Sequence, residues 1–186
     1  MKIIVFERVL THYRLKFYNY LVNDKGVDLI FCTKKIPNNE GFKTNISKAN
    51  FKIIVLRNFS LFGFEFYFLP IDFFKKENVF ISVLSLKALP ISIYLLFRVF
   101  DVKFYWWGHS QNFSQRNIFE NFKNRLKIKL INLSDGVLSY TQKEKEIFLK
   151  LGVRKIIYPL NNTIYIKKDQ LKTSSQNKSK LKFDLK

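Results

Sequence analysis

The sequence predicts an α/β fold in which a parallel β-sheet is covered by helices on both faces. Near-continuous apolar segments of strand length alternate with helix-like segments along most of the 186 residues. Polar residues follow several of these apolar segments directly, as in FYWWGHS, GVLSYT and KIIYPLNN. Apolar residues make up 47% and aromatic residues 17% of the chain, which excludes disorder for most of it. The length suits one domain with a sizeable core.

The first half of the chain is expected to hold strands at residues 2–6, 27–33, 51–56 and 79–83. A helix is expected over 12–22, because apolar residues recur there at helical spacing and Gly26 follows as a stop. Turn formers at 37–41 indicate a loop. The aromatic segment 59–69 indicates a hairpin or loop around Gly63, after which Pro70 opens a short helix.

The second half continues the alternation with strands expected at 102–107, 136–140 and 155–158. Helices are expected at 89–100, at 116–133 and from Thr141 to Gly152. The last of these begins with the capping-box pattern Thr-Gln-Lys-Glu and ends at a glycine. The helix at 116–133 is basic and places four apolar residues on one face: Phe119, Phe122, Leu126 and Leu130.

Residues 79–97 are strongly apolar, but Lys87 and Pro90 interrupt them in the middle. A membrane-spanning helix needs about 20 mostly apolar residues. A buried strand followed by a buried helix therefore explains this segment better than a span does. Cys32, the single cysteine, lies in an apolar segment and is predicted to be a buried free thiol. It excludes a disulfide framework and favours a reducing compartment, so we expect a cytoplasmic protein.

The formal net charge is +19, and +14 of it remains when residues 162–186 are left out. Such a charge favours a polyanionic partner, namely nucleic acid, an anionic membrane face or a phosphorylated substrate. An AT-rich genome would also enrich the chain in Lys, Asn, Ile and Phe without any partner. The basic helix at 116–133 is either solvated surface or a docking element for the inner membrane face.

In a parallel sheet the carboxyl ends of all strands meet at one edge, where α/β proteins bind ligands. The segments that follow the expected strands bring these polar residues to that edge: Arg8, Thr11, His12, Arg14, His109, Ser110, Gln111, Asn112, Tyr140 and Thr141. Both histidines of the chain are among them. The sequence therefore predicts a binding site at this edge.

His109 is the candidate catalytic residue, because a neutral imidazole can exchange a hydrogen bond with a substrate hydroxyl near physiological pH. Gly108 before it allows close approach of a ligand or loop. A loop histidine satisfied by backbone groups explains its position equally well. His12, Tyr13 and Arg14 open a helix and could hold an anion, although a solvated helix start is the simpler interpretation. Trp106 and Trp107 point to opposite faces of their strand and are expected in the core.

The chain lacks the glycine-rich dinucleotide motif, the phosphate loop, the nucleophile elbow and the HExxH metal motif. With two histidines and one cysteine, we expect no metal site. These absences argue against a nucleotide-hydrolysing, metal-dependent or serine-hydrolase activity.

The segments WWGHS, SDGVLSYTQKEKEIFLKLGV and YPLNNTI resemble the acceptor-side, N-terminal domain of family 4 glycosyltransferases, which have the two-domain GT-B fold. The opening THYR segment that leads into Phe17 and Tyr20 is also similar to the family. The resemblance covers most of residues 1–165. It rests on the order and spacing of several short motifs along the chain. It implies a Rossmann-like domain at 1–165, followed at 166–186 by a basic tail that corresponds to the truncated start of the interdomain linker and second domain.

The resemblance implies retaining transfer from a nucleotide sugar, bound mainly by a C-terminal domain, to a saccharide or lipid-linked acceptor held by this half. The nucleotide sugar would be a co-substrate, and no other cofactor is implied. His109 matches a histidine beside the transferred sugar. The other residues that match substrate-binding positions are His12, Tyr13, Arg14, Ser110, Tyr140 and Thr141.

Two features depart from the family pattern. The family's donor-binding domain carries two glutamates separated by seven residues, and this chain has no such pair. Arg8-Val9-Leu10 stands where the family has a glycine-rich loop. We therefore expect the isolated chain to be inactive. The alternatives are a membrane-anchoring subunit that binds a separate donor-binding chain and, ranked last, a basic nucleic-acid-binding protein, because no RNA-binding signature is present.

Overall fold

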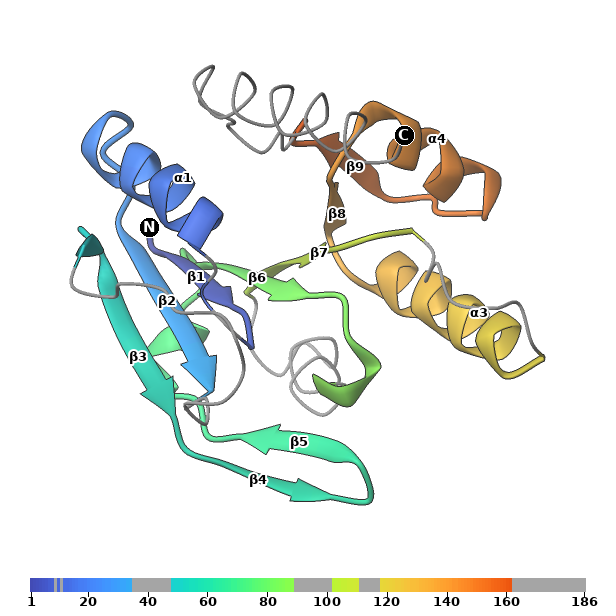
Figure 1. The fold of residues 1–186 in the computed structure, drawn as a ribbon, viewed down its shortest axis with the longest axis horizontal. Helices are drawn as coiled ribbons and strands as arrows, with labels where there is room; N and C mark the ends of the chain where they lie inside the picture. Colours follow the sequence, from blue (N-terminus) through green and yellow to red (C-terminus); the bar gives the residue numbers. More distant parts are fainter. Residues whose placement is uncertain (9, 11, 35–47, 89–101, 111–117, 162–186) are drawn as a thin grey trace, which may run out of the picture.

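The computed structural model describes residues 1–8, 10, 12–34, 48–88, 102–110 and 118–161. Seven strands form one sheet in the order β3-β2-β1-β6-β7-β8-β9, and every neighbouring pair is parallel (Figure 1). The strands are β1 (Ile3–Phe6), β2 (Leu29–Lys34), β3 (Lys52–Leu56), β6 (Val79–Val83), β7 (Lys103–Trp107), β8 (Gly136–Ser139) and β9 (Ile156–Pro159). The predicted Rossmann-like α/β class is confirmed.

The sheet grows outward from its centre in two directions. From β1 the chain moves to β2 and β3 on one side, and it returns through β6 to build the other side. The switch lies between β1 and β6, whose registers pair Ile3 with Val79 and Phe6 with Ser82. In open α/β sheets a ligand binds outside the carboxyl ends of the strands near such a switch.

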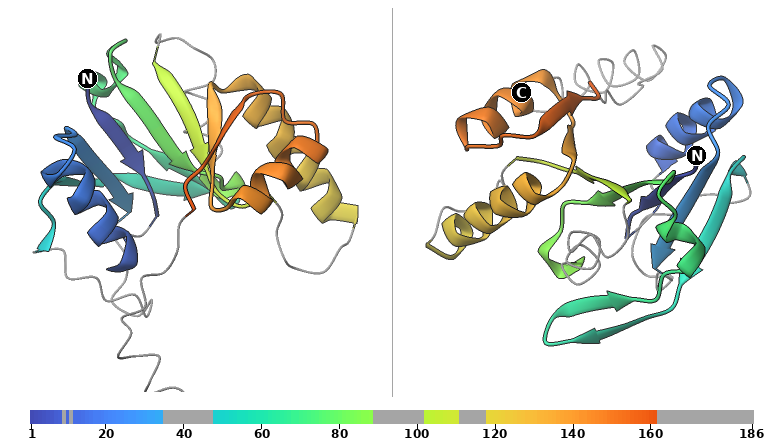
Figure 2. Two further views of the ribbon diagram at one scale, coloured as in Figure 1. Left: turned by 90° about the horizontal axis from the view of Figure 1, so that it is seen from above. Right: turned by 180° about the vertical axis from the view of Figure 1, so that it is seen from behind.

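Helices within the described ranges lie on both faces of this sheet (Figure 2). Helix α1 (His12–Asn23) packs Leu15 and Tyr18 against Val5, Phe31 and Trp107 on one face. Helices α3 (Ile118–Leu133) and α4 (Gln142–Lys150) pack against the opposite face, as does the 3-10 helix η2 (Ile71–Phe74). Because successive strand residues point to opposite faces, the two buried tryptophans belong to different clusters, as predicted.

The aromatic segment forms a two-stranded antiparallel hairpin of β4 (Asn58–Leu61) and β5 (Phe64–Tyr67), with Phe62 and Gly63 at the turn. It lies beyond the carboxyl ends of β2 and β3 (Figure 1). Strand β5 also contacts the short 3-10 helix η3 (Leu86–Ala88), which follows β6. The hairpin therefore lies along the edge of the sheet where ligands are expected.

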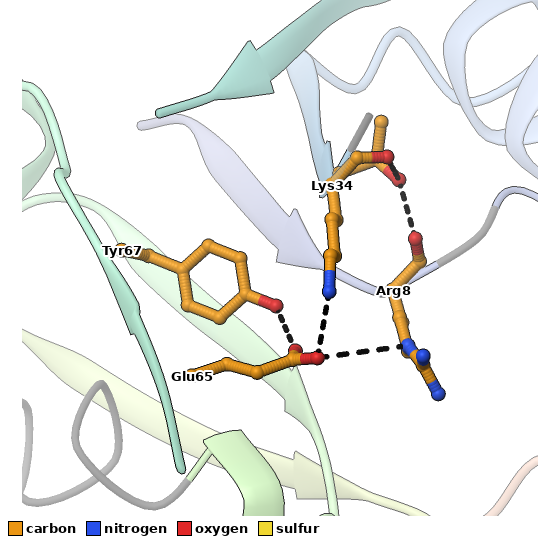
Figure 3. A network of polar contacts seen from close by, with 5 residues as sticks. Arg8, Lys34, Glu65 and Tyr67 are labelled. Atoms are coloured by element: carbon orange, nitrogen blue, oxygen red, sulfur yellow. Dashed lines mark hydrogen bonds and ion pairs between the residues drawn. The ribbon is translucent and has the colours of Figure 1, made fainter. Parts of the chain in front are cut away.

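A polar network fastens this hairpin to the sheet (Figure 3). Glu65 accepts a hydrogen bond from Lys34 Nζ at 2.9 Å and a second from the Tyr67 hydroxyl. Arg8 Nε lies 3.9 Å from the same carboxylate. The Tyr67 ring packs edge-on against Phe6, with 4.6 Å between the ring centroids. β5 is thus tied to residues at the ends of β1 and β2.

Most predicted elements agree with the structure to within two residues, and Cys32 is a buried free thiol. Burial raises its pKa to about 12. The apolar face predicted for the basic helix is partly wrong. Phe122 is 67% exposed, whereas Lys127 and Ile131 are buried beside Leu130. Pro70 precedes η2 with an extended backbone and is not its first helical residue.

The loop at 37–41, the helix at 89–100 and the tail at 166–186 lie outside the described residues. No helix within the described ranges is both long and apolar enough to cross a bilayer. Of the strand and helix expected in the apolar segment 79–97, the strand agrees with β6, whereas η3 at Leu86–Ala88 was not expected.

Candidate functional site

Four segments bring polar side chains together at the carboxyl edge of the sheet. Glu7 follows β1, Arg14 lies on the first turns of α1, His109 follows β7, and Tyr140 follows β8. They meet because β1 and β7 flank β6 in the sheet and β8 pairs with β7. This convergence at one edge is the arrangement that the sequence predicts.

Arg14 is the central side chain of this group. Its guanidinium forms an ion pair with Glu7, donates a hydrogen bond to the Tyr140 hydroxyl and lies 4.4 Å above the Trp107 ring centroid. Burial alone would lower the pKa of Arg14, but Glu7 and two tyrosines raise it overall. The cation is therefore permanent, and it links the end of β1 to the end of β8.

Glu7 is a buried carboxyl held from two sides. Tyr18 donates a hydrogen bond to Glu7 Oε1 at 2.6 Å, and Arg14 contacts the same oxygen. Burial raises the pKa of Glu7, and this effect outweighs the opposite influence of Arg14 and Tyr18. Burial and the neighbouring carboxylate also raise the pKa of Tyr18. Glu7, Arg14 and Tyr18 therefore form a buried polar layer beneath the edge.

His109 lies on the rim of the site, with 53% of its side chain exposed. Its Nδ1 lies 2.6 Å from Glu144 Oε1, and its ring stacks on Tyr140 with 4.2 Å between centroids. A carboxylate oxygen only accepts hydrogen bonds, so this contact places a proton on Nδ1 and leaves the acceptor lone pair of a neutral ring on Nε2. The imidazole is thus fixed in both orientation and tautomer.

Glu144 acts through the start of helix α4. Its backbone N–H donates to the Thr141 hydroxyl at 3.2 Å, which is one half of the predicted capping box. Its side chain does not return to the cap residue itself. Instead Oε2 accepts from the Tyr140 backbone N–H at 3.0 Å while Oε1 contacts His109. One carboxylate therefore closes the helix start and orients the histidine.

Gly108 is required by close packing at the end of β7. A Cβ added there would lie 2.7 Å from Leu84 Cβ, well inside normal contact distance. The neighbour that approaches its backbone is thus the chain segment that leaves β6. Gly108 N–H also donates to Leu138 O at 3.2 Å, which keeps the position before His109 in register with β8.

The predicted site residues are brought together to different degrees. Arg14, His109 and Tyr140 form one connected group. Thr141 caps α4 and Ser110 is buried at the same edge. His12 and Tyr13 begin α1, but their side chains lie outside what the structure describes.

Three residues of the group were not predicted from the sequence as site residues: Glu7, Tyr18 and Glu144. Glu7 directly follows the first strand, so the strand-end argument that selects Arg8 would also have selected it. For Glu144 the sequence predicts only a role in the helix cap. Trp107 is a core residue as expected, yet it also touches Arg14, and its buried indole N–H has no partner among the described residues.

The chemistry open to this group is acid–base and hydrogen-bonding chemistry at His109, supported by Glu144. Within the described residues, no three His, Cys, Asp or Glu side chains lie close enough to hold a metal ion. The buried Arg14–Glu7 pair is neutral as a unit and acts as a scaffold. An oriented imidazole on a strand-end rim suits contact with a hydroxyl-rich ligand.

No family model and no curated protein matches the chain. Among solved structures, it is similar to E. coli trehalose-6-phosphate protein bound with UDP-2-fluoro glucose, with a TM-score of 0.50 and 11% sequence identity. The similarity covers 98% of this chain, which spans about 55% of the length of that protein. At this identity the comparison bears on architecture alone. The chain has a Rossmann-like α/β fold similar to that of a GT-B glycosyltransferase.

Proposed function

We propose that the chain is the acceptor-binding half of a retaining glycosyltransferase that moves a sugar from a nucleotide sugar to a saccharide, including lipid-linked saccharides. The observation that carries the proposal is the His109 imidazole, oriented by Glu144 and Tyr140 at the carboxyl edge of a GT-B-like sheet. The motif order that resembles family 4 glycosyltransferases supports it. The single buried thiol is in keeping with a cytoplasmic location.

In this proposal His109 contacts the sugar at the point of transfer. Nε2 of the neutral ring accepts a hydrogen bond from a sugar hydroxyl, while Glu144 holds the opposite nitrogen. Tyr140 keeps the ring flat against the end of β8. Arg14 acts as a positioning residue, because its guanidinium is engaged with Glu7 and Tyr140. His12, Tyr13, Ser110 and Thr141 complete the substrate-binding set at the same edge.

Transfer also needs groups that stabilise the charge of the departing nucleoside diphosphate. Among the described residues, Arg14 is linked to His109 through Tyr140, but its guanidinium is paired with buried Glu7. We therefore propose that the donor is bound by a second domain or by a separate chain, and that the 186-residue chain alone does not transfer sugar. Recovery of a stoichiometric donor-binding protein on purification from cells would support the separate-chain form.

The two histidines give a direct test of saccharide binding by NMR. The ring-proton signal of His109 is assigned by its loss in H109Q, and the chain is titrated with a panel of oligosaccharides and short lipid-linked saccharides. We expect one class to shift the His109 signal. H109A should then bind that class about tenfold more weakly, because one hydrogen bond is lost.

Lys129→Ala serves as the control, since Lys129 is exposed on α3 away from the strand ends. It should bind the same saccharide with unchanged affinity. Failure of every saccharide class to shift the His109 signal would overturn the acceptor-binding role. Turnover of UDP-glucose by the purified chain would instead overturn its assignment as an inactive half.

A further inference from the structure

The β4–β5 hairpin presents its apolar side to solvent and its polar side to the protein. In its register Phe59 lies opposite Phe66, and Leu61 lies opposite Phe64. Because side chains alternate along a strand, these four residues share one face, whereas Ser60, Glu65 and Tyr67 lie on the other. The usual arrangement of a surface hairpin, apolar inside and polar outside, is reversed.

The polar face explains why the hairpin adopts this orientation. Glu65 is buried and accepts hydrogen bonds from Lys34 and Tyr67, and Arg8 lies nearby (Figure 3). It would cost free energy to place this paired carboxylate against an apolar surface, or to separate it from its cations. The network therefore keeps the phenylalanine face pointing outward.

The outward face forms a continuous aromatic surface. Phe59 and Phe66 stack with 4.8 Å between centroids and 5° between ring planes, and Phe68 approaches Phe59 at 6.0 Å. Phe59, Leu61, Phe64 and Phe68 are all exposed. Phe62 at the turn is 92% exposed and has φ of 49°, a left-handed backbone that bulky residues rarely adopt. A contiguous exposed apolar surface of this kind marks an interaction site.

The charges around the hairpin indicate which partner fits. The only charged residue within the hairpin strands is Glu65, and it is withdrawn to the other face. Exposed Arg57 precedes β4, and exposed Lys87 lies on η3, which contacts β5. An apolar centre with cations at its margin matches an anionic bilayer, which takes up aromatic side chains and attracts Lys and Arg.

Two other partners fit less well. A second copy of the chain would bring another net charge of +19 against this one, so the electrostatic term opposes self-association. Single-stranded nucleic acid needs cations placed along the backbone track between the stacking rings. The aromatic face has no cation between its rings.

We propose that the aromatic face of the β4–β5 hairpin docks on an anionic lipid bilayer, with Leu61 and Phe62 at the tip entering the interface. Arg57 and Lys87 then contact lipid headgroups at its margin. Because the hairpin is tied to Arg8, next to Glu7, docking brings the carboxyl edge of the sheet near the bilayer. The inference rests on the hairpin alone and does not require the proposed glycosyl transfer.

The direct test uses tryptophan fluorescence of Phe62→Trp in the full chain. Trp106 and Trp107 are both buried, so they give a constant background and the new side chain reports on the tip. Vesicles of phosphatidylglycerol and phosphatidylcholine in about equal parts should shift the emission to the blue and protect it from acrylamide. Vesicles of phosphatidylcholine alone should produce a much weaker effect, because the charge attraction is absent.

A matched pair of double variants then locates the docking surface by vesicle sedimentation. L61S/F62S removes exposed apolar side chains from the hairpin tip, and F122S/L133S removes exposed ones from basic helix α3. We expect L61S/F62S to lower the vesicle partition coefficient at least about tenfold, because two apolar side chains no longer leave water. The α3 control should change it by less than about twofold.

Circular dichroism of both variants verifies that the fold is retained. Loss of vesicle binding in F122S/L133S but not in L61S/F62S would overturn the proposal and assign docking to α3. The face would be assigned to a second copy if the wild type sedimented as a dimer and did not bind vesicles, and if L61S/F62S were a monomer. A response of F62W to a single-stranded oligonucleotide but not to vesicles would overturn it as well.

Discussion

At the scale of single residues, the molecule holds two buried or nearly buried carboxyls whose pKa values move in opposite directions. Burial raises the pKa of Glu7. Burial acts in the same direction on Glu65, but Tyr67, Lys34 and Arg8 outweigh it and lower the pKa of that carboxyl. The two groups therefore give the protein opposite pH signatures, and each can be isolated by substitution.

Arg14→Met should destabilise the protein by about 3 kcal/mol, because it leaves Glu7 buried without its cation. Arg14 lowers the pKa of Glu7, so its removal raises that pKa further. A carboxyl with a raised pKa in the folded state contributes stability at low pH and loses it as the pH rises through that pKa. The deficit of R14M relative to wild type should thus grow as the pH rises above the wild-type folded-state pKa of Glu7, which itself lies above 4.5, as measured by urea unfolding.

The double variant E7Q/R14M provides the control for this prediction. With no ionisable group at position 7, its stability deficit should not vary with pH in this way, and it should be less destabilised than R14M. The coupling between the two positions follows from the double-mutant cycle. A deficit of R14M that is independent of pH would show that Arg14 does not shift the pKa of Glu7 in the folded state.

The sequence predicts some of the site residues but not the residues that contact them. His109, Arg14 and Tyr140 are found because each follows a strand or starts a helix at the predicted edge. Glu7 directly follows β1, so the same strand-end argument applies to it. Glu144 is recognised as a site residue only when β7 and β8 are paired, since its contact with His109 joins segments 35 residues apart. A carboxylate in a capping box has no local sign that one of its oxygens orients a histidine.

At the scale of elements, the polar side-chain contacts that tie the hairpin to the sheet are made with one carboxylate, that of Glu65. Glu65→Gln should destabilise the protein by about 1–2 kcal/mol at neutral pH, because the charge-assisted bonds from Lys34 and the attraction of Arg8 are weakened. A carboxyl with a lowered folded-state pKa contributes stability above its usual value of 4.5 and loses it as the pH falls. The deficit of E65Q should therefore shrink below about pH 4.5 in urea unfolding experiments.

Asp72→Asn is the control for Glu65, because Asp72 is an exposed acid whose nearest cation, Lys75, lies 4.0 Å away on the surface. Its effect should stay within about 0.5 kcal/mol at every pH. Equal stability of E65Q and wild type at neutral pH would contradict the anchoring role of this network.

Strands are the elements that the sequence predicts best. Their apolar runs are continuous because both faces of the sheet are covered, and turn formers separate them. The hairpin is also expected from its aromatic run around Gly63. Which of its faces points outward depends on the partners of Glu65, so the local sequence does not predict it. The face of α3 is missed for a similar reason, since burial of Ile131 and exposure of Phe122 are set by where the helix meets the sheet.

At the scale of the whole molecule, a net charge of +19 opposes compaction. The thermal unfolding midpoint should therefore rise by a few degrees when NaCl is increased from about 0.05 M to about 0.5 M, because screening weakens the repulsion. Differential scanning calorimetry measures the shift. A midpoint that falls with salt would show that attractive surface pairs dominate.

A charge-reversal variant sharpens this prediction. K129E/K143E lowers the net charge from +19 to +15, because each reversal removes two positive charges, and both side chains are exposed on helices. Its midpoint should be higher than that of the wild type at low salt and should respond less to added NaCl.

The order of strands in the sheet also determines when each strand can pair with its neighbours during translation. Strand β1 needs β6 on its inner side, and Ile3 pairs with Val79, which is translated much later. At about 5–20 residues per second, the ribosome leaves that side of β1 without its neighbour for on the order of several seconds. β1, an interior strand of the finished sheet, is thus an open edge early in synthesis, and we expect it to need chaperone protection during translation.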